Sequence, residues 1–290
     1  SINKNTKAIF IPNLIGSLPD WKKLRKIANK HNLLLIEDSA DTMGAKIDGQ
    51  STGKYSDFSI CSFYGSHIIN CAGNGGILCL NKKKDYLRAL ILRSWGRDSS
   101  IFKESEKIEN RFKVKLGKYD YDAKFLFSEL GYNFEPSEIG ASFGNVQLKK
   151  LSHNLKVRNK HQKKYENYFN KRKKYFQIIK KDRKIFTSYL AFPVVLNDDY
   201  LSRKKLQIFL EKNSIQTRVI FTGNITLHPC MKNINHIVNK YGLKNSNIVA
   251  KNGILLPCHH GLQEKDINKI LSLLDKFIIN LGYETKKSLY

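Results

Sequence analysis

The chain has 290 residues, of which 41% are hydrophobic and 11% aromatic. This length and composition indicate one large or two modest folded domains and exclude a disordered chain. Lys and Arg number 51 against 25 Asp and Glu, which gives a formal net charge of +26. The basic residues are spread along the chain without a finger, helix-turn-helix or RNA-binding signature, so we expect no nucleic-acid partner. A positive field of this kind also attracts anionic small substrates.

The apolar runs and the cysteines indicate in which cellular compartment the protein is expected. The longest apolar runs, such as LLLIE and GILLP, are too short to span a bilayer, and residues 1–7 do not form a signal peptide. The five cysteines are odd in number and lack C-x-x-C spacing, which argues against a disulfide framework and a zinc site. We therefore expect a cytoplasmic protein with reduced thiols, no metal and no membrane partner.

In chain order, the first part of the sequence predicts a βαβ unit. Residues 8–13 (AIFIPN) are typical of a buried strand, and Ser17 is expected to cap a helix with the apolar spacing of Trp21, Leu24 and Ile27. The strand 33–38 (LLLIED) follows and is apolar on both faces, which is typical of a parallel sheet. Two further strands are expected at residues 57–63 and 75–80.

Beyond about residue 110 the pattern indicates a smaller α/β unit. Helices are expected at residues 138–151, 154–176, 202–215 and 262–281, and strands at 188–196, 217–221 and 253–257. This divides the chain into a cofactor-binding large domain (1–150) and a long helix with a small C-terminal α/β domain (151–290). The chain starts at Ser1 rather than at Met and enters a strand almost at once, so we expect the front part of the large domain to lie upstream.

Polar residues stand beyond the expected strands, where open parallel sheets bind ligands. Asp38 ends the strand 33–38, and His67 follows the strand 57–63, with Ser62 and the glycines of AGNGG close by. A carboxylate for a ring nitrogen, a hydroxyl for a phosphate and an imidazole for proton transfer together form a cofactor-site set. Each residue alone also has a structural explanation, as a turn cap, as part of a strand or as an ordinary loop residue.

The order of these segments resembles the DegT/DnrJ/EryC1/StrS sugar aminotransferase family, whose members use pyridoxal phosphate and have fold type I. The resemblance rests on IEDSADTMGA (36–45) and SFYGSHIINCAGNGG (62–76). It continues through RSWGRD (93–98), residues 119–151, TRVIFTGN (217–224) and LLPCHHGL (255–262). It implies an α/β fold with a mostly parallel sheet in a larger domain and a smaller C-terminal α/β domain. The family's opening section has no counterpart in this sequence.

The resemblance also implies roles for single residues. Asp38 would keep the pyridine nitrogen of the cofactor protonated, and Ser62 would bind its phosphate. Asn133 would reach the phosphate in the neighbouring subunit's site, which implies a homodimer. Asp41 stands where the family usually has Gln or His near the phenolic oxygen of the ring, so we assign it to cofactor binding and leave its role open.

His67 occupies the position of the lysine that bonds covalently to the cofactor in ordinary family members. Imidazole has no primary amine and cannot form that bond, but it moves protons near neutral pH. The same exchange marks the branch of CDP-4-keto-6-deoxyglucose 3-dehydrase and GDP-4-keto-6-deoxymannose 3-dehydratase, which hold pyridoxamine phosphate without a covalent bond. The resemblance thus implies a lyase of lipopolysaccharide or other polysaccharide biosynthesis. Its reaction would be 3-dehydration of a 4-keto-6-deoxy nucleotide sugar, with His67 as acid–base.

Two alternatives remain beside this hypothesis: a 4-keto-sugar aminotransferase, and a non-catalytic paralogue that pairs with an active family member.

The resemblance also bears on a second cofactor, because CDP-4-keto-6-deoxyglucose 3-dehydrase carries a [2Fe–2S] cluster and works with a reductase. No cysteine lies between Cys79 and Cys230, so four-cysteine ligation is not available. We therefore expect neither an iron–sulfur cluster nor an electron-transfer reductase.

Five further residues are candidates for substrate contacts. Arg218 either contacts the sugar or phosphate or is a surface arginine. Trp95 and Arg97 either border the substrate pocket or pack a turn. His259 and His260 either line the site or cap a loop, and adjacent histidines without carboxylates are weak evidence for a metal.

Overall fold

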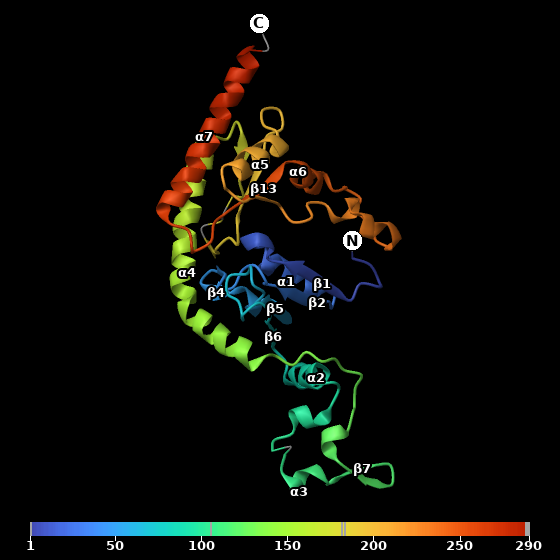
Figure 1. Ribbon diagram of the computed structural model, residues 1–290. Coiled ribbons are helices and arrows are strands. Elements are labelled where there is room, and N and C mark those ends of the chain that lie inside the picture. The colour runs from blue at the N-terminus through green and yellow to red at the C-terminus, as the bar shows by residue number, and fades with distance from the viewer. Residues whose placement is uncertain (1, 105, 181, 183, 288–290) are drawn as a thin grey trace.

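The computed structural model describes residues 2–104, 106–180, 182 and 184–287. The N-terminal unit is built on a four-stranded sheet in the order β1-β2-β5-β6 (Figure 1). Its strands are β1 (Ala8–Pro12), β2 (Leu34–Asp38), β5 (Phe58–Ser62) and β6 (Gly76–Leu80). The first three are parallel and β6 is antiparallel to β5, so the expected βαβ unit and mostly parallel sheet are confirmed.

Helix α1 (Trp21–Lys30) packs on one face of this sheet, where Trp21 and Ala28 form a buried cluster with Leu33 and Leu35. The carboxylate of Asp20 caps the helix by accepting a hydrogen bond of 3.0 Å from the Lys23 amide. The prediction that Ser17 is the cap is wrong, because the 3₁₀ turn Leu14–Gly16 and residues 17–20 separate β1 from the helix. A small sheet of β3 (Lys46–Ile47), β4 (Gln50–Ser51) and β10 (Ile185–Phe186) lies beside it.

The other face of the four-stranded sheet is largely open within the described part of the chain. Phe10, Leu34 and Leu78 expose 59%, 44% and 46% of their surface. Side chains alternate between the faces of a strand, so Asp38 and Ser62 point to this same open face.

Residues 83–135 form an arm that extends away from the sheet (Figure 1). The arm contains α2 (Lys83–Arg93), α3 (Ile108–Arg111), β7 (Val114–Leu116) and β8 (Tyr119–Tyr121). It returns to the end of α2 through a β-bridge between Ser94 and Asn133.

Helix α4 (Glu138–Asn170) is a single helix of 33 residues, capped by Ser137. The sequence predicts two helices here, and this is wrong because the residues between them, Ser152 and His153, contain no helix-breaking proline or glycine. The helix runs along the molecule and reaches both the N-terminal sheet and the C-terminal unit (Figure 1). It also crosses residue 150, so the division into domains at that residue stays a prediction.

The C-terminal unit has an antiparallel sheet in the order β12-β13-β11-β9. Its strands are β9 (Phe176–Gln177), β11 (Phe192–Leu196), β12 (Arg218–Val219) and β13 (Gly253–Leu256), and its helices are α5 (Arg203–Lys212), α6 (Lys244–Asn252) and α7 (Glu264–Lys287). The expected Ser202 cap of α5 is confirmed, since its side chain accepts from the Lys205 amide. Two expected strands are shorter in the structure: 188–196 begins at Phe192, and 217–221 is reduced to two residues.

The core of this unit is formed by α4, α5 and α7 against one face of the sheet. Tyr165 and Phe169 of α4 stack on Phe192, and Leu206 and Ile267 are fully buried beside them. Across the described residues, no helix has the length and apolar character needed to cross a membrane.

Candidate active site

Asp38 and Ser62 are the last residues of two neighbouring parallel strands. Asp38 lies beside Ile60 in the register of β2 and β5, and Ser62 follows two residues later on the same face. Oδ1 of Asp38 accepts a hydrogen bond of 3.0 Å from the Ala40 amide, and Oγ of Ser62 accepts one of 3.2 Å from the Tyr64 amide. Both polar groups therefore stand at the carboxyl edge of the sheet, as expected from the strand pattern.

His67 lies in the turn after β5, where its amide donates to the Tyr64 carbonyl at 3.0 Å. Its Nε2 is 3.8 Å from Oδ1 of Asp41, and its Nδ1 is buried with no hydrogen-bond partner among the described residues. The ring meets Tyr64 edge-on at a centroid distance of 6.1 Å. The imidazole thus lies between a carboxylate at ion-pair distance and an aromatic ring, and its Nδ1 has no hydrogen-bond partner among the described residues.

Asp41 connects His67 to the backbone of the turn after β1. Its Oδ2 accepts a hydrogen bond of 2.9 Å from the Ile15 amide. Burial raises the pKa of Asp41, an effect that the Ile15 amide and His67 oppose and that Asp38 reinforces. The structure therefore gives Asp41 two contacts within the chain, and its expected role in cofactor binding stays a prediction.

The Ile15 contact depends on an unusual backbone conformation. Ile15 has a φ of 63°, in the left-handed region that β-branched residues rarely adopt. Its carbonyl accepts from the Leu190 amide at 2.8 Å, so the same residue joins the site to the C-terminal unit. Sequence reasoning missed this residue, because nothing in the local pattern signals a strained isoleucine.

The loop that carries His67 is pressed against the first turns of α4. The Cys71 amide donates to the Phe63 carbonyl at 3.0 Å, which closes the loop back onto the end of β5. A Cβ atom on Gly144 would lie 2.4 Å from Sγ of Cys71, so only glycine allows α4 to approach this closely. Sequence reasoning included this segment in the resemblance but did not identify the contact.

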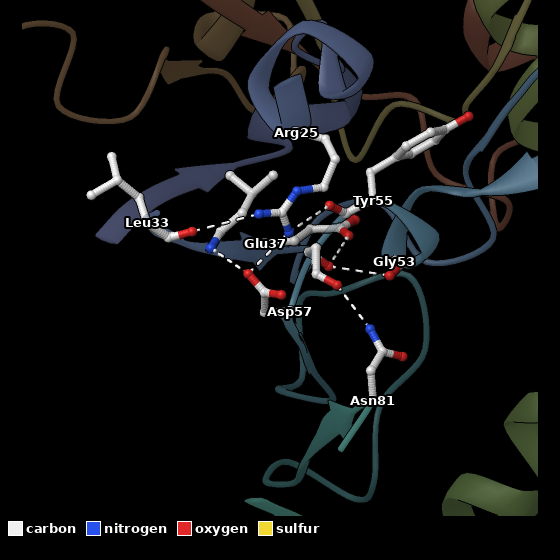
Figure 2. A network of polar contacts seen from close by, with 9 residues as sticks. Arg25, Leu33, Glu37, Gly53, Tyr55, Asp57 and Asn81 are labelled. Atoms are coloured by element: carbon white, nitrogen blue, oxygen red, sulfur yellow. Dashed lines mark hydrogen bonds and ion pairs between the residues drawn. The ribbon is translucent and has the colours of Figure 1, made fainter. Parts of the chain in front are cut away.

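Sequence reasoning also missed Glu37, which is fully buried next to Asp38. Figure 2 shows it near Gly53, where an added Cβ atom would lie 3.8 Å from Oε2 of Glu37. The signal was present, since Glu37 directly follows the apolar run Leu33–Ile36 and a charged residue buried there needs hydrogen-bond partners.

Three of the predicted residues, Trp95, Arg97 and Asn133, belong to the arm. Asn133 is exposed, and its backbone pairs with Ser94. The guanidinium of Arg97 stacks on Trp95 at 4.5 Å from the ring centroid. No contact joins these residues to Asp38, Asp41 or His67 in the described part of the chain, and their roles toward substrate or a partner stay predictions.

Arg218 and His259, in contrast, are brought together. Both line a cavity of about 400 Å³ beside β12 and β13, together with Thr217 and Lys269. Nη1 of Arg218 donates to the Thr217 carbonyl at 3.0 Å. Burial lowers the pKa of His259 and of His260, and nearby Arg158 lowers both further. His260 does not line this cavity, and its Nδ1 is buried without a partner among the described residues.

Residues 1–275 match the model of the DegT/DnrJ/EryC1/StrS aminotransferase family. The chain belongs to this family. The expected resemblance and fold class, fold type I with a mostly parallel sheet and a smaller C-terminal α/β domain, are thereby confirmed.

Individual relatives cover almost all of this chain but are longer. The lipopolysaccharide biosynthesis protein RfbH of Salmonella typhimurium is 27% identical over 96% of the chain and 64% of its own length. The dTDP-4-dehydro-2,6-dideoxy-D-glucose 3-dehydratase of Saccharopolyspora spinosa is 28% identical over 96% of the chain and 60% of its own length. The chain therefore spans less than two thirds of these curated relatives.

Among solved structures, the fold is similar to that of the E. coli GDP-4-keto-6-deoxy-D-mannose-3-dehydratase with bound hydrated PLP. The TM-score is 0.82 and the identity 25%, over 94% of this chain and 68% of that one.

Proposed function

We propose that this chain belongs to a pyridoxamine- or pyridoxal-phosphate-dependent enzyme that removes the 3-hydroxyl of a 4-keto-6-deoxy nucleotide sugar. The observation that carries the proposal is the placement of His67. A residue without a primary amine stands in the turn after β5, at the carboxyl edge that also holds Asp38 and Ser62. The names of the relatives support a nucleotide-sugar substrate and a role in lipopolysaccharide or deoxysugar biosynthesis.

The donor set is suited to this cofactor. Oδ2 of Asp38 has no hydrogen-bond partner within the described residues and is available to a protonated ring nitrogen. The Ser62 hydroxyl accepts from Tyr64 and keeps its own hydrogen for a phosphate oxygen. When bound, pyridoxamine phosphate supplies an amine and an electron-withdrawing ring.

The chain's own residues supply orientation and proton transfer. In this proposal the imidazole of His67 transfers the proton, and the carboxylate of Asp41 lies 3.8 Å from Nε2, on the side where it balances a positive charge on the ring. The Ile15 amide donates to Oδ2 of Asp41 and so fixes the orientation of this carboxylate, with Oδ1 on the side of the imidazole. Asn133 reaches the cofactor site of the neighbouring subunit of a homodimer in this proposal, as the family resemblance implies.

Borohydride reduction tests the proposal directly. Wild-type protein loaded with pyridoxal phosphate is reduced, digested and examined by mass spectrometry for a cofactor-modified lysine. We expect none in wild type and a covalent adduct at position 67 in His67→Lys. A modified lysine in wild type would instead support the 4-keto-sugar aminotransferase.

Turnover separates the dehydratase from a non-catalytic paralogue. Wild type with pyridoxamine phosphate and a 4-keto-6-deoxy nucleotide sugar should yield a 3-deoxy product, in which hydrogen replaces the 3-hydroxyl, together with one equivalent each of pyridoxal phosphate and ammonia. His67→Asn keeps a hydrogen-bonding side chain of similar size but cannot act as a general base, so it should abolish turnover while cofactor binding persists. Cofactor binding without turnover in wild type would support the paralogue.

A further inference from the structure

Glu37 carries a fully buried carboxylate in the strand that ends at Asp38. Its Oε1 accepts hydrogen bonds from Nδ2 of Asn13 at 2.7 Å, from Oγ of Ser39 at 2.5 Å and from Oγ1 of Thr52. Its Oε2 accepts from Oγ of Ser56 at 3.2 Å. Asn13 follows β1, Ser39 follows β2, and Thr52 and Ser56 precede β5. One carboxylate therefore binds three of the loops that connect the strands of the sheet.

The network surrounds the backbone of Asp38. The Asn13 amide donates to the Asp38 carbonyl at 2.8 Å, and the Ser39 amide donates to the Ile60 carbonyl at 2.8 Å. Glu37 points to the α1 face of the sheet and Asp38 to the opposite face, because neighbouring residues of a strand alternate. Glu37 therefore cannot touch a group bound by Asp38 and can act only through the chain between them.

The donors around Glu37 require an acceptor at this position. Oδ1 of Asn13 accepts from Nε1 of Trp21 at 2.7 Å, which turns both amide hydrogens toward Glu37 and Ser39. An apolar residue at position 37 would leave these donors unpaired. Glutamine would keep the oxygen that three donors share, and its amide could donate to Ser56, whose hydrogen then turns to the Gly53 carbonyl at 3.3 Å.

We propose that Glu37 is a positioning residue for Asp38, through the hydrogen bonds that hold Asn13, Ser39 and Thr52 at the carboxyl edge of the sheet. The role toward a cofactor rests on the proposed function, whereas the ordering of Asp38 does not. In metal sites the loss of contacts that orient the ligating residues commonly weakens binding, and we expect an effect in the same direction here.

Asp57 provides a matched control in the same sheet. Its carboxylate accepts from the Leu35 amide at 2.8 Å and pairs with Arg25 at 3.0 Å. Figure 2 shows Arg25 reaching from α1 toward Asp57, Leu33 and Tyr55. Leu35 lies near the start of β2, so Asp57 fixes the amino end of the strand whose carboxyl end Glu37 fixes.

Hydrogen exchange tests the inference without any cofactor. In Glu37→Ala we expect faster exchange at the amides of Asn13, Ser39 and Ala40 than at the amide of Leu35. Asp57→Ala should show the reverse order, and Glu37→Gln should resemble wild type. Thr52→Val removes one hydrogen-bond donor to Glu37 with little change in shape. It should give the same order of exchange rates as Glu37→Ala with smaller differences, and it provides the test if Glu37→Ala does not fold. Uniform exchange changes, or none near Asp38, would overturn the inference.

Cofactor titration tests its consequence for function. At a temperature where all variants are folded, pyridoxal phosphate should bind Glu37→Ala about tenfold more weakly, with a changed absorption band. Glu37→Gln and Asp57→Ala should stay close to wild type in affinity and band. Equal losses of affinity for pyridoxal phosphate in Glu37→Ala and Asp57→Ala would show that Glu37 only stabilises the sheet and does not position Asp38. Failure of wild type to bind would refute the proposed function and leave the exchange result to decide the ordering of Asp38.

Discussion

The carboxylate of Asp41 lies between the imidazole of His67 and the amide of Ile15. Oδ1 is 3.8 Å from Nε2 of His67, and Oδ2 accepts the Ile15 amide at 2.9 Å. The group proposed to carry a proton is thereby linked to the turn that joins the N-terminal sheet to Leu190 of the C-terminal unit.

Asp41→Asn should change the pH dependence of stability. Burial raises the pKa of Asp41 above 3.8, so the folded state binds its proton more tightly than the unfolded state does. The ionised carboxylate therefore disfavours folding above its folded-state pKa, and this effect disappears as the pH falls through that pKa. Asparagine still accepts the Ile15 amide and lacks the charge.

Denaturant unfolding from pH 4 to 8 measures this effect. The free energy of unfolding of Asp41→Asn relative to wild type should rise with pH from about pH 4 and then level off, because only wild type gains a buried charge. A difference that stays constant over this range would contradict the assignment.

Gly16→Ala should disrupt the contact between the turn after β1 and Tyr189 of the C-terminal unit. Gly16 has a φ of 122°, and a Cβ atom there would lie 2.5 Å from Cδ1 of Tyr189. We expect the free energy of unfolding to fall by more than about 2 kcal/mol, from backbone strain and overpacking together. Gly49→Ala is the control, since Gly49 has a φ of 77° with no atom within 4 Å, and it should cost about 1 kcal/mol. Equal effects of both substitutions would show that the Tyr189 contact is unimportant.

Gly144→Ala should displace the loop that carries His67. The added methyl group would collide with Sγ of Cys71, four residues after His67. We expect lower stability and lower turnover in the single variant, and recovery of both in Gly144→Ala/Cys71→Ala, because the second substitution removes the colliding sulfur. A double-mutant cycle checks this, and additive effects would contradict a direct contact.

Arg218→Ala should weaken binding of nucleoside diphosphates. Arg218 and His259 line one cavity, and a lost charge-assisted hydrogen bond to phosphate is worth about 1.5–3 kcal/mol, which corresponds to a tenfold or larger rise in Kd. Arg97→Ala is the control, because Arg97 stacks on Trp95 in the arm. Calorimetric titration with GDP, CDP and UDP compares the two variants. A loss in Arg97→Ala alone would place the nucleotide near Trp95 instead.

The residues that sequence reasoning placed well depend on local patterns. Asp38 and Ser62 end apolar strands, and a parallel register brings such ends to one edge. Ser202 precedes an amphipathic run and caps α5 as expected. The contacts that were missed join residues far apart in sequence: Asp41 to Ile15 and Glu37 to Asn13 span 26 and 24 positions. Periodicity carries no information about which distant donor a buried carboxylate meets.

Helix α4 touches the His67 loop through Gly144 and enters the C-terminal core through Tyr165. Its 33 residues correspond to roughly 50 Å at 1.5 Å per residue. Over that length, a tilt of about one degree moves the far end by roughly 1 Å. A rigid tilt of α4 at the loop beside His67 would therefore displace the C-terminal unit by about the same amount.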